Sequence, residues 1–235
     1  MNINRFQLSR FGYMEQKFKL DIEGTVICDF GKKLHKCNVS VRVQLRTSIN
    51  LKGVYIHINM YNADKKLIFL DSIYFETLDS TINRVLSYNF PHTEYPIKVI
   101  AYPSYFKNFY GYRLKLLLNA ESDGELNKIN KLKTETLEEL EKKHGIEIRG
   151  NAFSQYDEDQ EEYEIEVLFE AIGDELDYRL DYVINVYNSA GLLIGVDTLY
   201  TNSKFDGYQS YSQAVYISNG ETPSNIIIYP KPKSS

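Results

Sequence analysis

Apolar and polar residues alternate along most of this chain, and the alternation predicts short β-strands. Residues 39–45 and residues 163–169 carry apolar side chains at every second position, and the side chains between them are polar except for Leu168. That period is typical of a strand with one buried and one solvated face. Further runs of the same kind occur in both halves of the chain, so the pattern favours an all-β fold.

The stretch at residues 182–200 repeats the stretch at residues 56–74 without a gap. Tyr61-Asn62 in the first copy corresponds to Tyr187-Asn188 in the second, an offset of 126 residues (187 − 61 = 126). Each copy predicts a β-hairpin, because two apolar runs flank a turn that contains Asn together with Asp or Gly. Residues 147–150 match residues 21–24 at the same offset. We therefore infer an internal duplication.

A duplication of this length predicts two tandem domains. About six to eight short strands in each are typical of an antiparallel β-sandwich of immunoglobulin-like type. Between them, apolar residues recur every three to four positions up to Leu140, after a capping-box spacing at Ser122 to Glu125, which predicts one amphipathic connecting helix of about five turns. The expected division is an N-terminal segment of open structure at 1–19, a first sandwich at 20–118, the helix at 119–145 and a second sandwich at 146–235.

Composition narrows the classes of function. Hydrophobic residues make up 43% of the chain and charged residues 25%, which excludes wholesale disorder. The net charge of −5 argues against a nucleic-acid partner, and no run of about 18 apolar residues predicts a membrane span. The N-terminal residues lack the apolar core of a signal peptide, so we expect a cytoplasmic protein, or a cell-surface module if an export signal has been removed.

The repeated segments Ile58 to Asn62 and Ile184 to Asn188 resemble the signature of the FxLYD domain family. That signature is an aromatic or apolar residue, any residue, an apolar residue, Tyr and then Asp or Asn, followed by a turn and a second strand. The family's Phe is Ile in both copies here. The resemblance implies a β-sandwich fold; it implies no catalytic residues, and family members often belong to exported or membrane-anchored bacterial proteins.

Two groups of residues are candidates for a metal site or a catalytic site. Cys28, His35 and Cys37 cluster around the first hairpin tip, but zinc needs a fourth ligand that the sequence does not supply, so the thiols are expected to fill apolar space. Asp71 and Asp197 are equivalent positions of the two copies, and we expect each to bind nearby backbone amides, not to act as a catalytic pair. No catalytic residue, metal or cofactor is predicted.

Two surface features are candidates for binding a partner protein. The first is a difference between equivalent hairpin tips: one is basic, and the other, at residues 157–162, is acidic. Opposite charge on the tips suggests a head-to-tail contact between two molecules. The basic residues are Lys32, Lys33 and Lys36, and the acidic residues are Asp157, Glu158, Asp159, Glu161 and Glu162.

The second candidate is an aromatic stretch interleaved with Lys107 and Arg113. It could seal the junction between the first sandwich and the connector, bind a partner protein or stack single-stranded nucleic acid, in that order of expectation. Its rings are Tyr105, Phe106, Phe109, Tyr110 and Tyr112.

These observations predict a non-catalytic protein that recognises or scaffolds another protein, which could be a second copy of itself. The competing hypothesis is an enzyme or small-ligand binder with a site in a cleft between the two domains.

Overall fold

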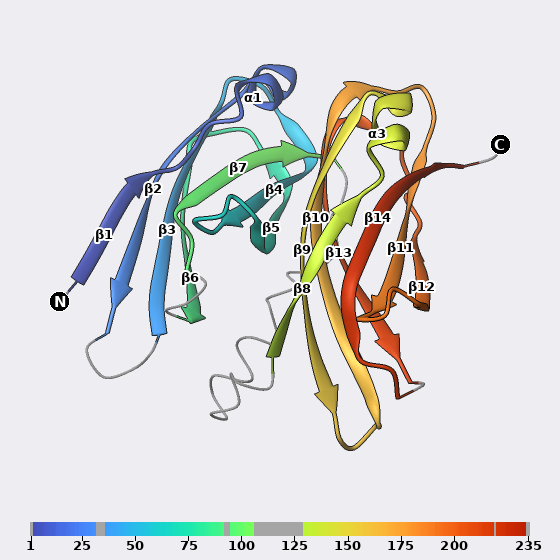
Figure 1. The fold of residues 1–235 in the computed structure, drawn as a ribbon. Helices are drawn as coiled ribbons and strands as arrows, with labels where there is room; N and C mark the ends of the chain where they lie inside the picture. Colours follow the sequence, from blue (N-terminus) through green and yellow to red (C-terminus); the bar gives the residue numbers. More distant parts are fainter. Residues whose placement is uncertain (1, 32–35, 92–94, 106–128, 219, 234–235) are drawn as a thin grey trace. The chain divides into compact units, whose positions relative to one another are not determined.

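The computed structural model describes residues 2–31, 36–91, 95–105, 129–218 and 220–233. The chain divides into two compact units, which we call unit 1 (residues 1–118) and unit 2 (residues 119–235). Strands with antiparallel pairing dominate both units (Figure 1). The predicted all-β class is therefore confirmed.

Unit 1 forms two sheets. One has the strand order β1-β2-β3-β6 and the other the order β5-β4-β7, and all these neighbours pair antiparallel. Figure 1 shows the two sheets as separate layers, with the short helix α1 at one end. The elements are β1 (Asn2–Gln7), α1 (Gly12–Phe18), β2 (Leu20–Phe30), β3 (Lys36–Thr47), β4 (Leu51–Tyr61), β5 (Leu67–Leu78), β6 (Ile82–Pro91) and β7 (Lys98–Ser104).

Unit 2 contains the same types of element in the same order, but its strands join into one seven-stranded sheet, β12-β11-β14-β8-β9-β10-β13. Strand β8 connects the two halves, because residues 129–132 pair antiparallel with β9 and residues 133–136 pair parallel with β14. The elements are β8 (Ile129–Thr136), α3 (Glu138–His144), β9 (Ile146–Asp157), β10 (Glu162–Glu175), β11 (Leu180–Asn188), β12 (Leu193–Leu199), β13 (Asp206–Ile217) and β14 (Pro223–Pro232).

The duplication extends further than the repeated hairpin. Helices α1 and α3 begin and end at positions related by the same offset of 126 residues, and each is followed by a residue in the left-handed conformation, Lys19 (φ 50°) or Gly145 (φ 65°). The join made by β8 also has a counterpart, because Ser9 in unit 1 forms an isolated parallel bridge with Ile100 of β7. Each unit therefore begins with a segment that pairs first with one strand and then with another, with β2 and β7 in unit 1 and with β9 and β14 in unit 2.

The predicted five-turn connecting helix is wrong over most of its described length. Residues 129–136 form strand β8, and the helix is limited to Glu138–His144. Leu132 is 3% exposed, but it enters the core of unit 2 from a strand. Strand β8 is stabilised by backbone pairing on both of its edges, and such pairing outweighs a modest helical propensity. The expected capping box at 122–125 lies outside the described residues.

The N-terminal segment at 1–19, whose structure the sequence left open, belongs to unit 1. Strand β1 pairs with β2 from Asn2↔Phe30 to Gln7↔Thr25, and the backbone N–H of Leu8 donates to the carbonyl of Gly24. A Cβ at position 24 would lie 2.1 Å from the backbone carbonyl oxygen of Arg42 on the paired strand, which explains why this position is a glycine.

The repeated Asn of each hairpin stabilises the turn. Asn62 Oδ1 accepts hydrogen bonds from the backbone N–H groups of Asp64 (3.1 Å) and Lys66 (3.0 Å). Asn188 Oδ1 accepts the equivalent bonds from Ala190 and Leu192, both 3.0 Å. A short side-chain acceptor at this position satisfies amides that the tight turn leaves without backbone partners, which is why the Asn recurs.

Candidate functional site: an exposed sheet face of unit 2

Most of the predicted aromatic stretch lies outside the described residues, namely Phe106, Phe109, Tyr110 and Tyr112. Tyr105 is described; it is 54% exposed, and its ring centroid is 4.7 Å from that of Phe18 in α1. This contact lies within unit 1.

The acidic tip is a hairpin turn between β9 and β10. Asp157 pairs with Glu162, and Asp157 Oδ1 accepts hydrogen bonds from the backbone N–H groups of Asp159 (2.9 Å) and Gln160 (3.1 Å). Glu158, Asp159 and Glu161 are exposed. In the opposing basic tip only Lys36 is described, at the start of β3, while Lys32 and Lys33 lie outside the described residues. The head-to-tail pairing of the tips thus stays a prediction.

The two cysteines are free and fully buried on the paired strands β2 and β3. A hydrogen bond with Cys28, together with burial, raises the pKa of Cys37 above its ordinary value, which favours the neutral thiol. His35, the third residue of the candidate metal cluster, lies outside the described residues. Among the residues that are described, no group of three or more His, Cys, Asp or Glu side chains could hold a metal ion.

Asp71 and Asp197 each bind a backbone amide and one side chain of a neighbouring strand. Asp71 accepts from the N–H of Ser72 (2.8 Å) and from Tyr88 Oη (2.8 Å). Asp197 accepts from the N–H of Thr198 (2.7 Å) and from Gln213 Nε2 (2.6 Å). Asp71 thus connects β5 of one sheet of unit 1 to β6 of the other sheet, and Asp197 connects β12 to β13, the two edge strands of the unit 2 sheet, which is a structural use of the repeated acid.

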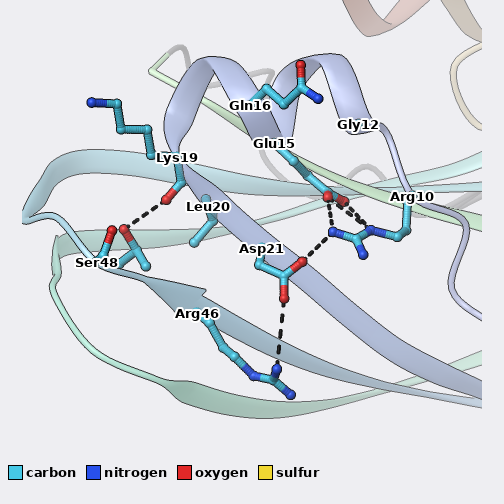
Figure 2. Close-up of a pocket in the computed structure, with 10 residues that line it drawn as sticks. Arg10, Gly12, Glu15, Gln16, Lys19, Leu20, Asp21, Arg46 and Ser48 are labelled. Atoms are coloured by element: carbon cyan, nitrogen blue, oxygen red, sulfur yellow. Dashed lines mark hydrogen bonds and ion pairs between the residues drawn. The ribbon is translucent and has the colours of Figure 1, made fainter.

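A hollow of about 890 Å³ lies beside α1, and charged side chains line it (Figure 2). Arg10 Nη2 bonds to the buried Glu15 (2.5 Å) and to Asp21, and Arg46 Nη1 lies 3.9 Å from the other oxygen of Asp21. Figure 2 shows Arg10 between the two carboxylates. The carboxylates that line the hollow are paired with the guanidinium groups of Arg10 and Arg46, which line it too. We therefore interpret this charged cluster as the attachment of helix α1 to strand β2.

Unit 2 exposes apolar side chains on one face of its β11–β12–β14 strands. Leu193 lies opposite Tyr187 and Val196 opposite Asn185, and directly opposed residues of a ladder share a face. This is the outer face, because core residues such as Ile184 and Val186 point the other way. We call its exposed apolar part the β12 patch, which consists of Leu192 (62% exposed), Leu193 (52%), Val196 (57%) and Tyr200 (68%).

The equivalent positions of unit 1 are mostly buried. Leu67, which corresponds to Leu193, is 1% exposed, and Leu70, which corresponds to Val196, is 7% exposed. The tyrosine position is exposed in both units: Tyr74 is 54% exposed, and its counterpart Tyr200 is 68% exposed. Exposed apolar side chains gathered along one strand are typical of an interaction site. The β12 patch is therefore the strongest candidate binding surface among the described residues.

Sequence reasoning missed this patch, although it identified the hairpin that carries it. The available signal was the turn itself, where Lys66 of the first copy is replaced by Leu192 in the second. A leucine in place of a lysine at an exposed turn indicates a surface that contacts another molecule.

No protein-family model matches this chain, and no curated protein matches it either. The described part of the chain has no helix with the length and apolar character needed to cross a membrane.

Proposed function

We propose that this chain is a non-catalytic protein-binding module that recognises a partner protein through the β12 patch. The observation that carries the proposal is the exposure of four large apolar side chains at or beside the edge strand β12: Leu192, Leu193, Val196 and Tyr200 are each more than half exposed. A few side chains, tyrosine prominent among them, contribute most of the affinity in many protein interfaces, and Tyr200 is the most exposed member of the β12 patch. A surface of this kind binds a complementary apolar surface on a protein.

The fold assignment within this proposal is a pair of immunoglobulin-like sandwiches related to the FxLYD family. It is supported by the pairing of β3 with β6 and of β4 with β7, because strands three apart in sequence also pair in both sheets of an immunoglobulin sandwich. The turn-stabilising role of Asn62 and Asn188 supports the resemblance, since it gives a physical reason for the Asn of the signature.

The proposed location is the cytoplasm. The support is that both cysteines, the only two in the sequence, are free thiols, as is usual where glutathione keeps thiols reduced. Immunodetection of the protein in separated cell fractions tests this part of the proposal. Recovery in the extracellular or envelope fraction would contradict it.

The binding proposal is tested by comparing variants as bait in a lysate of the native cell. Val196→Asp and Tyr200→Ala should each lose proteins that the wild-type chain retains, because one places a charge in the apolar patch and the other removes its most exposed ring. Tyr74→Ala is the matched control, since Tyr74 is the equivalent of Tyr200 in unit 1. Equal retention by all three variants and the wild type would refute the proposal.

The opposite charges of the hairpin tips provide a second, separate prediction about partners. If the tips attract one another between molecules, self-association should weaken as salt rises, because exposed charges are screened. Light scattering at low and high ionic strength tests this prediction. An unchanged monomer mass in both conditions would exclude it.

A further inference from the structure

The only two cysteines of the sequence occupy neighbouring positions in unit 1. Cys28 on β2 pairs with Val39 of β3. Cys37, two residues before Val39, pairs with Phe30, so the two cysteines are diagonal neighbours in one ladder. Residues two apart on a strand point to the same face of the sheet. The two thiols therefore share one face of the β2–β3 pair, and both are 0% exposed.

Weak hydrogen bonds order the two thiols. Cys28 Sγ donates to the backbone carbonyl of Pro96, just before β7 (3.7 Å). The hydrogen bond between the two thiols lowers the pKa of Cys28, while the same bond, followed by burial, raises the pKa of Cys37. These opposite directions indicate that Cys37 donates and Cys28 accepts. Cys28 is thus the sulfur that loses its proton first, and the thiolate is the reactive form of cysteine.

The fold does not require this pair of thiols. The equivalent residues of unit 2, at the repeat offset of 126, are Ser154, which is buried, and Tyr163, which is partly buried. The same hairpin therefore forms with a hydroxyl at one position and an aromatic ring at the other. Two thiols in contact have a chemistry that these replacements lack, which is oxidation to a disulfide.

We propose that Cys28 and Cys37 form a site of reversible oxidation, at which a hydroperoxide such as hydrogen peroxide converts the two thiols into a disulfide within the chain. The basis is the placement of the two sulfurs side by side in one ladder. The inference goes beyond the proposed function and does not depend on it, because both thiols lie in unit 1 and the β12 patch lies in unit 2.

The oxidation has two steps. The thiolate of Cys28 attacks one oxygen of hydrogen peroxide and breaks the O–O bond, which leaves a sulfenic acid on Cys28 and releases hydroxide. The hydroxide takes up the proton that Cys28 lost and becomes water. The sulfur of Cys37 then attacks the sulfenic sulfur, forms the S–S bond and expels hydroxide, which takes the Cys37 proton and becomes a second water. The two sulfurs are oxidised, and the peroxide is reduced.

The position of the pair in the hairpin accounts for access and for reversal. Cys28 lies two residues before the end of β2, and Cys37 is the second residue of β3. Strand ends open locally at low free energy, so a molecule as small as peroxide can reach these buried thiols.

The geometry of diagonal neighbours favours a disulfide that is easily reduced. Diagonal partners lie about 7–8 Å apart, whereas the Cα atoms of a disulfide lie about 4.4–6.8 Å apart, so closure requires a small shift of β2 against β3. A bond that requires such a shift is strained, and strained disulfides are the labile ones. A small thiol such as glutathione then reduces it by exchange and is itself oxidised to a disulfide.

Intact-mass measurement of the full wild-type chain tests the inference. The folded protein is exposed to hydrogen peroxide and then unfolded in the presence of an alkylating reagent. The treated chain should have lost the mass of two hydrogen atoms and should take up no alkyl group. A second sample, treated with reduced glutathione after the peroxide and before unfolding, should take up two alkyl groups. Circular dichroism of the oxidised chain should retain the β signal.

Four results would each overturn the inference. They are two thiols that still alkylate after peroxide, oxygen added to both sulfurs with no disulfide, a disulfide that forms only after denaturation, and a disulfide that glutathione fails to reduce.

Single variants test the roles of the two sulfurs. Cys37→Ser should leave the sulfenic acid of Cys28 without its second reactant, so a dimedone probe should label Cys28 after peroxide. Cys28→Ser, which places the residue of the equivalent Ser154 at this position, should carry about tenfold less label on Cys37, because burial keeps that thiol neutral. Equal labelling of the two variants would overturn the assignment of Cys28 as the attacked sulfur.

Discussion

Replacing Glu141 by Ala removes a buried carboxylate that attaches helix α3 to two strands. Glu141 is 8% exposed. Its Oε2 accepts a hydrogen bond from Thr136 Oγ1 (2.8 Å), and its Oε1 accepts one from the backbone N–H of Ile148 (2.5 Å). The equivalent carboxylate of unit 1, Glu15, is 5% exposed and bonds to Arg10. A buried acid at the same point of both repeats indicates a shared structural requirement.

The expected loss follows from these two bonds. A hydrogen bond to a charged group contributes about 1.5–3 kcal/mol, and leaving the buried Ile148 N–H without its acceptor adds to the cost. Because Glu141 retains a little solvent access, we expect Glu141→Ala to lower the free energy of unfolding by about 2–4 kcal/mol. Glu141→Gln, which keeps one neutral acceptor and the shape of the side chain, should cost about half as much.

Chemical denaturation of the full chain, followed by circular dichroism, measures this difference. Glu139→Ala is the matched control, since Glu139 lies in the same helix and is exposed. The control should change the free energy of unfolding by less than about 0.5 kcal/mol, as surface substitutions usually do. If Glu141→Ala and Glu139→Ala unfold at the same denaturant concentration, the assigned role of the buried carboxylate is wrong.

Two further predictions test other parts of the fold. Gly173→Ala should destabilise the protein by about 1–3 kcal/mol, because a Cβ would lie 2.2 Å from the backbone carbonyl oxygen of Gly145. Gly12→Ala, with no atom within 4 Å of the new Cβ, should not destabilise it; equal melting temperatures of the two variants would contradict this reasoning. His144 is 7% exposed, and burial, followed by the charge of Lys143, lowers its pKa below the ordinary 6.5. The unfolded chain then binds the proton more readily than the folded chain, so stability should fall as pH drops below about 6.5 towards the lowered pKa. His144→Phe, the residue type of the equivalent Phe18, should reduce this acid-side loss in melting curves measured from pH 7 to pH 5, and an unchanged pH dependence would exclude His144 as its source.

The sequence predicted the repeated hairpins because their information is local. Alternation of apolar residues and a turn with Asn62 or Asn188 define a hairpin without knowledge of the rest of the chain. The connecting helix was mispredicted for the opposite reason, since β8 depends on two partners that are distant in sequence, β9 and β14. An overlooked signal was present: Glu15 and Glu141 stand at the repeat offset, which relates residues 1–19 to residues 127–145.

The binding surface could not be predicted from the sequence in the same way. Leu67 and Leu193 are the same residue type at equivalent places, yet one is 1% and the other 52% exposed. Exposure depends on what covers a face in the folded chain, and hydrophobic patterning alone reports only which faces are apolar.

Hydrogen–deuterium exchange of residues 192–200, measured with the protein free and in its bound state, tests the central claim most directly. We expect the amides of this segment to exchange more slowly once the β12 patch is covered by a partner, while the equivalent residues 66–74 of unit 1 keep their rates. Protection that appears only elsewhere in the chain, with residues 192–200 exchanging equally fast in both states, would contradict the assignment of this face as the binding surface.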